Sequence, residues 1–163
     1  MNVGASAPEE SGLYFSWGNS PGHAEGAGYE FSSEVYDETP AAAIEANLTL
    51  AEDMARQSLG SPWRMPTDAE FQELIDNCTS VWTTQNGVIG RLFTSNVNGN
   101  SIFFPAAGYY DGTSLEAKEE EGCYWSSTYH SASDAIYLNF TEVSIIPANN
   151  IARDLGQSVR AVQ

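Results

Sequence analysis

The stretch that decides the expected fold is residues 63–78, Trp-Arg-Met-Pro-Thr-Asp-Ala-Glu-Phe-Gln-Glu-Leu-Ile-Asp-Asn-Cys. Thr67 and Glu70 stand three residues apart directly after a proline, which is the pattern of a capping box at a helix N-terminus. Apolar side chains then recur on one helical face, at Phe71, Leu74, Ile75 and Cys78. Because this i, i+3, i+4, i+7 spacing is typical of a core-facing helix, packing alone explains Cys78, with no reactivity implied.

The chain before this helix combines irregular and regular stretches. Residues 1–11 are expected to be a disordered lead-in, and residues 18–40, rich in Gly, Ser, Glu and Pro, are expected to be a loop. Apolar residues alternate with smaller or more polar ones over 13–17, which predicts a first strand. A second capping box, Thr49-Leu-Ala-Glu52, predicts a helix that ends before Gly60.

The chain after Asn77 changes from a helical to a two-residue apolar period. Asn98-Gly99 lies between two such runs and suits the type I′ turn of a β-hairpin, because both residues tolerate positive φ. Helices early and strands late indicate an α+β fold within one domain, residues 12–163. The expected late strands cover 91–97, 100–104, 124–127, 135–140, 143–146 and 158–162.

The charge of the chain excludes two kinds of partner. Acidic residues outnumber basic ones by 22 to 6, which gives a formal net charge of -16. A surface so negative repels phosphate backbones and anionic lipid headgroups, so neither nucleic acid nor a membrane surface is expected as a partner. No run reaches the roughly 18 apolar residues that a membrane-spanning helix needs, so membrane insertion by this domain is not expected.

Residues that carry catalysis or bind metals are scarce. His23 and His130 are the only histidines, and no nucleophile elbow is present. Three adjacent carboxylates, Glu119–Glu121, do not converge from different directions as calcium ligands must. Two cysteines support neither a disulfide framework nor a zinc site, and whether they are bridged or free stays open. The sequence therefore predicts no enzyme, no metal site and no cofactor.

Residues 126–155 have an unusual composition for a stretch that must be partly exposed. They lack Lys, Gln, Trp and Met, and Glu142 is their only Glu, while Tyr, His, Asn, Asp and Ser are abundant. Strands and tight loops favour such residues in any case. The same residues also serve in antibody paratopes, where a rigid aromatic ring offers contact area at low entropic cost. Composition alone leaves both explanations open.

Seven blocks of the sequence, spread over residues 12–162, together resemble one family. They are Gly12-Leu-Tyr-Phe-Ser-Trp-Gly18, Trp63-Arg-Met-Pro-Thr67, Glu70-Phe-Gln-Glu-Leu74, Trp82-Thr-Thr-Gln-Asn-Gly87, Phe104-Pro-Ala-Ala-Gly108, Tyr124-Trp-Ser-Ser-Thr128 and Gly156-Gln-Ser-Val-Arg160. The chain resembles a large bacterial paralogous-domain family related to the formylglycine-generating-enzyme branch of the C-type lectin fold. This resemblance implies two helices flanking a compact, twisted, mostly antiparallel sheet, with long loops and with the first and last strands paired.

Members of that family serve as variable proteins of diversity-generating retroelements, and this implies a function. Their Asn codons are miscopied into codons that exclude Glu, Lys, Gln, Met and Trp, the types nearly missing from 126–155. The chain departs from related proteins in two ways. The catalytic cysteine pair of formylglycine-generating enzymes has no counterpart, since Cys78 is expected on a helix and Cys123 before a strand. The Glu-Pro-Asn and Gln-Pro-Asp triplets of calcium-dependent sugar-binding lectins are absent.

The resemblance places a variable ligand-binding segment at about residues 129–155. Within the strand 135–140 we expect Leu138 and Phe140 to point inward, and Tyr137 and Asn139 to point outward. The expected ligand-binding residues are Tyr129, His130, Asp134, Tyr137, Asn139, Asn149, Asn150, Ile151, Asp154 and Leu155.

The expected ligand is a macromolecule, a protein, bound by a monomeric domain that is displayed outside the cell. One alternative is a fixed-specificity glycan-binding or adhesin surface module of the same fold. A more distant alternative is an oxidase of the formylglycine-generating type. A neighbouring reverse transcriptase gene, with a near-copy of the 3′ coding end, would separate the first hypothesis from the other two.

Overall fold

Ten strands form three sheets in the computed structural model, which describes residues 1–163. The largest sheet has the order β1-β10-β7-β8-β9, formed by Tyr14–Phe15, Gln157–Ser158, Gly122–Tyr129, Asp134–Phe140 and Ile145–Ala152. The second sheet contains β2, β3 and β4, which are Cys78–Gln85, Val88–Ser95 and Ser101–Pro105. The third contains β5 and β6, which are Tyr109–Asp111 and Ser114–Glu116. Only the β10–β7 pair is parallel.

Three short helices and one 3₁₀ helix complete the fold. They are α1 (Ser33–Asp37), η1 (Pro40–Ala43), α2 (Met54–Leu59) and α3 (Asp68–Asn77). The prediction of an α+β fold with mostly antiparallel strands is confirmed, although there are three α-helices where two were expected. None of them has the length and apolar character that a membrane crossing requires.

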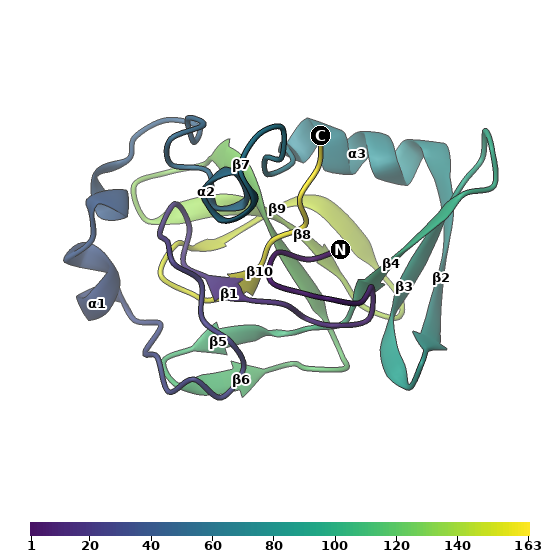
Figure 1. The fold of residues 1–163 in the computed structure, drawn as a ribbon, viewed down its shortest axis with the longest axis horizontal. Helices are drawn as coiled ribbons and strands as arrows, with labels where there is room; N and C mark the ends of the chain where they lie inside the picture. Colours follow the sequence, from purple (N-terminus) through teal and green to yellow (C-terminus); the bar gives the residue numbers. More distant parts are fainter.

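The two ends of the chain meet at β1 and β10, as expected. Tyr14 pairs with Ser158 in antiparallel register, and Figure 1 shows the N-terminal segment running beside β10. The backbone N–H of Val3 donates to the carbonyl of Val159 at 2.9 Å, and the Val3 side chain is buried. Residues 1–11 are therefore packed on the domain, and the prediction of a disordered lead-in is wrong.

The middle strands of the largest sheet, β7 and β8, are covered on both faces. On one face Trp125 packs in a cluster with Trp17. On the other face Leu138 packs in a second cluster with Phe71 of α3. The core therefore lies on both sides of this sheet, and a strand in its middle has no solvent-facing side.

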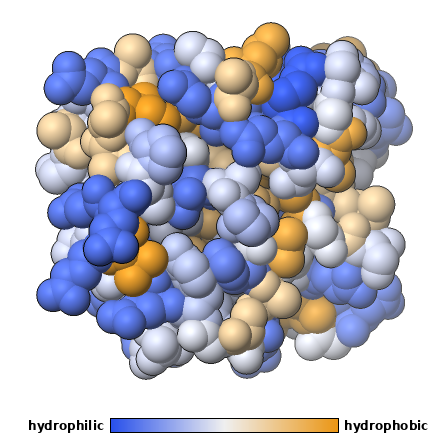
Figure 2. All heavy atoms as spheres, turned by 60° about the vertical axis from the view of Figure 1, so that its left-hand side comes forward, coloured by the Kyte–Doolittle hydropathy of each residue, from blue (hydrophilic) through white to orange (hydrophobic).

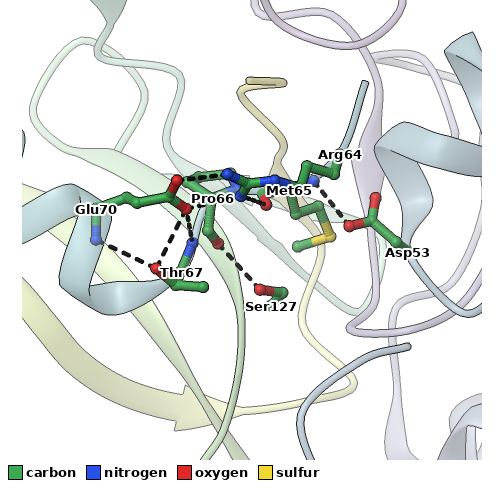
Figure 3. A network of polar contacts seen from close by, with 7 residues as sticks. All are labelled: Asp53, Arg64, Met65, Pro66, Thr67, Glu70 and Ser127. Atoms are coloured by element: carbon green, nitrogen blue, oxygen red, sulfur yellow. Dashed lines mark hydrogen bonds and ion pairs between the residues drawn. The ribbon is translucent and has the colours of Figure 1, made fainter. Parts of the chain in front are cut away.

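The capping box at the start of α3 is confirmed (Figure 3). The Glu70 N–H donates to Thr67 Oγ1 at 3.2 Å, and the Thr67 N–H donates to Glu70 Oε2 at 2.9 Å. Arg64 donates to the same carboxylate, and this contact lowers the pKa of Glu70 to about 2. Ser127 donates its N–H to the carbonyl of Pro66 at 2.8 Å. Its hydroxyl donates to the same carbonyl at 3.3 Å (Figure 3), and both bonds fix the start of α3 against β7.

The predicted start of α2 at Thr49 is wrong. Thr49 and Glu52 do interact, since the Thr49 N–H donates to Glu52 Oε2 at 2.8 Å, but they form a turn before the helix. Asp53 is the true N-cap, because its Oδ1 accepts the Arg56 N–H at 2.8 Å. Its Oδ2 accepts the N–H of Met65 at 2.8 Å (Figure 3), so this carboxylate also joins α2 to the stretch before α3.

The β3–β4 hairpin is confirmed, but its turn is not the predicted one. The N–H of Ser95 donates to the carbonyl of Asn100, so the connection spans residues 96–100. Gly99 has a φ of 74°, whereas Asn98 is not in the positive region, and this excludes a type I′ turn. The strand β2 was not predicted.

Other boundaries differ where long-range pairing outweighs local preference. The expected loop 18–40 contains α1, and Cys78 is the first residue of β2, not part of the α3 face. Only residues 145–146 of the expected strand 143–146 belong to a strand, β9, which also takes in most of the expected loop behind it. Pairing with β8 supports β9 despite its Pro and Asn residues, which favour turns in isolation. The last strand is shorter than the expected 158–162.

Candidate ligand-binding site

Two loops of the segment 129–155 lie side by side at one end of the largest sheet. They are the β7–β8 loop, residues 130–133, and the connection from β9 to β10, residues 153–156. Asp134 pairs with Ala152 in register, and the N–H of Arg153 donates to the carbonyl of Ser133 at 3.0 Å. Figure 1 shows α1 beyond the same end of the sheet, at the left of the view.

Arg153 joins the two loops to the rest of the domain. Its side chain is 1% exposed, and its guanidinium carbon lies 4.6 Å from the centre of the Trp17 ring. The guanidinium donates to the carbonyls of Ala132 and Ala41, each at 2.9 Å. It forms no ion pair, so backbone carbonyls and an aromatic face are its partners. The sequence prediction missed Arg153, although it is the only Lys or Arg in 126–155.

A cavity of about 340 Å³ lies between these loops and α1. Ala132, Ala152 and Asp154 line it from the segment 129–155, and Tyr36 and Asp37 line it from α1. No sequence pattern pointed to the α1 wall, because five helical residues within a Gly- and Ser-rich stretch carry no periodicity. The structure thus adds α1 to the predicted site.

The electrostatic environment of this cavity is acidic. Burial raises the pKa of Asp154, and negative charge from three neighbouring carboxylates raises it further, namely Asp111, Asp37 and Asp134. The negative charge of Asp154 is therefore less stable in the unliganded domain than that of a solvated aspartate. A positively charged or hydrogen-bond-donating group would relieve this repulsion.

Positive charge is nearly absent from the exposed surface. Three of the six basic residues are buried, namely Arg91, Arg153 and Arg160. Two more form ion pairs, Arg64 with Glu70 and Lys118 with Glu25. The remaining one, Arg56, is half-buried. The side that carries α1 faces the reader in Figure 2 and is mostly hydrophilic, with hydrophobic side chains in small separate groups.

Three predicted site residues lie at the β7–β8 loop. The Tyr129 side chain is half-buried, and its backbone N–H donates to Asn47 Oδ1 at 2.8 Å. His130 is exposed. Asp134 Oδ2 accepts the hydroxyls of Ser131 and Ser133, at 3.2 and 2.7 Å. Asp134 thus holds the turn in shape, and its carboxylate forms no pair with His130.

The predicted outward orientation of Tyr137 and Asn139 is wrong, because β8 has no solvent-facing side. Tyr137 is 5% exposed and Asn139 is 7% exposed. The Tyr137 hydroxyl accepts from Asn149 Nδ2 at 3.2 Å. Asn139 Nδ2 donates to Glu121 Oε2 at 3.0 Å and faces Cys123 Sγ at 3.7 Å. These side chains belong to the core of the scaffold.

The cysteines are both free. Cys123 is 1% exposed, and burial followed by the negative charge of Glu121 raises its thiol pKa to about 12. A thiol so protonated is a weak nucleophile near neutral pH.

The predicted site residues in β9 lie on opposite faces of this edge strand, and two more follow it in the chain. Asn149 and Ile151 pair with Tyr137 and Ala135 and are half-buried. Ile151 packs against the core cluster that contains Trp17 and Trp125. Asn150, between them in the strand, is exposed on the opposite side. Leu155 and Asp154, in the connection that follows, are half-buried. The structure therefore places His130 and Asp154 at the same end of the largest sheet, whereas Asn150 lies apart from them.

No group of three or more His, Cys, Asp or Glu side chains is arranged to hold a metal ion. The groups that a ligand can contact in the cavity beside Arg153 are aspartate carboxylates, a tyrosine and small side chains.

Comparison with known proteins finds one family model, without a described activity, that matches part of the chain. Residues 82–162 match the model of a family described as a domain of unknown function (DUF8237). Neither a curated protein nor a solved structure matches the chain. The matched residues include β3 to β10 and all the predicted ligand-binding residues.

Proposed function

We propose that this chain is a non-catalytic ligand-binding domain of C-type-lectin-like fold, the variable protein of a diversity-generating retroelement. Its binding surface consists of the exposed residues of the β7–β8 loop, the half-buried Asp154 and Leu155 of the β9–β10 connection, and α1. The domain acts as a monomer outside the cell, and its ligand is a protein.

The observation that carries this proposal is that the two loops are held by contacts to their backbone. Arg153 binds the carbonyl of Ala132, and Asn47 binds the N–H of Tyr129. Ser16 donates its hydroxyl to the carbonyl of Asp154 at 2.8 Å. Because these anchors contact main-chain atoms, the loops can keep their shape when the side chains at 130, 132 and 154 change.

The composition of the segment supports the same proposal. The residue types missing from 126–155 are those that adenine-directed miscopying cannot produce at Asn codons, apart from Glu142. Glu142 lies in the β8–β9 turn, outside the two loops that we assign to binding. The charge distribution further supports a ligand whose contacting face is neutral or basic.

The genome tests the origin of the variation. The flanking DNA should carry a reverse transcriptase gene and a near-copy of the 3′ coding end in which adenines stand at the codons for exposed positions. Absence of both would favour a fixed-specificity glycan-binding or adhesin module.

A binding selection tests the surface itself. His130, Ala132, Ala152 and Asp154 are randomised with codons ending in a pyrimidine, and the displayed library is selected on lysozyme, a basic protein. Binders should be enriched and should lose binding when the four positions revert to the parent residues. The proposal fails if a library randomised at four exposed positions elsewhere yields binders as readily.

A further inference from the structure

A second and larger cavity lies between α3, the β3–β4 hairpin and the last residues of the chain. This groove has a volume of about 730 Å³, within the range of about 300–1,000 Å³ that is usual for small-molecule sites. Most of its wall is apolar and includes Phe71, Leu74, Ile102 and Phe104. It shares no residue with the segment 129–155, so it is separate from the proposed binding surface.

The hairpin leaves apolar side chains uncovered at this groove. Val97 is 86% exposed and Ile102 is 40% exposed, and both line the groove. A ligand bound in the groove would remove the apolar area of these side chains from water. Apolar area alone does not define the ligand, and the charged residues of the groove are needed for that.

Arg160 is a buried cation that lacks a counter-ion. It lines the groove, is 8% exposed, and its guanidinium carbon lies 4.8 Å from the centre of the Phe104 ring. Its Nη1 donates to Asn2 Oδ1 at 3.3 Å and to the carbonyl of Phe103 at 3.2 Å. Burial lowers the pKa of Arg160, because no carboxylate is in contact to stabilise its charge. An anion at this position would offset the free-energy cost of burying the charge of Arg160.

The two acidic residues of the groove do not supply this anion. The Glu70 carboxylate is occupied by Arg64 and by the N–H of Thr67, as Figure 3 shows. Glu73 is exposed on α3 and forms no ion pair. Arg160 therefore remains the one buried charge of this groove without a counter-ion.

We propose that this groove binds an aliphatic carboxylate, a fatty acid of medium chain length. The carboxylate pairs with the guanidinium of Arg160, and the aliphatic chain lies along Phe71, Leu74 and Ile102. The carboxylate supplies the missing counter-ion, while the chain covers the exposed apolar side chains of the hairpin.

Calorimetric titration with decanoate and decan-1-ol tests both parts of this site in the intact chain. Decanoate should bind saturably, and decanol should bind at least about tenfold more weakly, since it lacks a charge-assisted hydrogen bond to Arg160. Ile102→Glu should weaken decanoate binding by about tenfold or more, because it places a negative charge on the apolar wall, beside the bound carboxylate and its chain. Val143→Glu is the matched control, since Val143 is 92% exposed and does not line the groove.

Three results would overturn the proposal. They are no saturable binding of decanoate, equal binding of decanol and decanoate, or equal losses in Ile102→Glu and Val143→Glu. The test does not depend on a variant of Arg160, whose contacts with Asn2 and Phe103 help to hold the chain ends.

Discussion

The guanidinium carbon of Arg153 lies 4.6 Å from the centre of the Trp17 ring. This contact holds the β9–β10 connection against the core cluster that contains Trp17 and Trp125. Trp17 in turn donates its Nε1–H to the carbonyl of Ser126 at 2.8 Å, in β7. One cation–aromatic contact thus links a residue near the start of the chain to both loops of the proposed binding surface. The arrangement makes Arg153 part of the scaffold, although it lies inside the segment that we propose to vary.

Arg153→Met should therefore destabilise the domain. The variant loses two charge-assisted hydrogen bonds, to the carbonyls of Ala132 and Ala41, and the contact of the guanidinium with the Trp17 ring, which together cost about 3 kcal/mol or more. Urea denaturation followed by tryptophan fluorescence measures the change in the free energy of unfolding. Arg56→Met is the matched control, since the Arg56 side chain forms neither a hydrogen bond nor an ion pair, and a similar loss in both variants would argue against the anchoring role of Arg153.

Asp154→Asn should stabilise the unliganded domain near neutral pH. Burial and neighbouring carboxylates raise the pKa of Asp154, so the folded state binds this proton more tightly than the unfolded state does. The contribution of Asp154 to stability therefore falls as the pH rises through its pKa, and asparagine removes this loss. Thermal melts at pH 3 and pH 7 should show a gain over the parent that is larger at pH 7, whereas the exposed Glu142→Gln should show no such difference.

The loss of stability on replacing a tryptophan with alanine should be larger for a more buried tryptophan. Trp125 is fully buried, and its Nε1–H donates to the carbonyl of Phe15 at 2.7 Å, so Trp125→Ala should cost about 3–5 kcal/mol. Trp63 is only half-buried, so Trp63→Ala should cost less. Chemical denaturation of both variants makes the comparison, and equal losses would mean that the core is assigned wrongly.

The elements that the sequence predicted well are those specified by neighbouring residues. The Thr67–Glu70 capping box lies within one turn, and its apolar stripe predicted α3 without knowledge of the tertiary structure. By contrast, α1 is held from a distance, because the Tyr36 hydroxyl donates to the carbonyl of Trp17 at 2.8 Å. No local sequence pattern within residues 18–40 indicates such a long-range contact.

The errors in the predicted site have one main physical cause. Alternation along a strand assigns residues to an inner and an outer face only when one face meets solvent. Because β8 is covered on both faces, Tyr137 and Asn139 are buried like Leu138 and Phe140, although slightly less completely. The loop residue His130 is exposed as expected. Strand order could not be derived from the sequence, and burial in the middle of the sheet follows from that order.

The central claim is that the side chains of His130, Ala132 and Asp154 in the two loops, and of Ala152 at the end of β9, are energetically separate from the scaffold. One displayed library randomises His130, Ala132, Ala152 and Asp154, and a matched library applies the same codons to four buried positions of β8, namely Ala135, Tyr137, Leu138 and Asn139. The most direct measurement is the fraction of each library that resists a protease. Surface changes usually alter stability by about 0.5 kcal/mol or less, whereas buried changes cost several times more. We therefore predict that most members of the first library and few of the second remain resistant, and equal fractions in the two libraries would contradict the account.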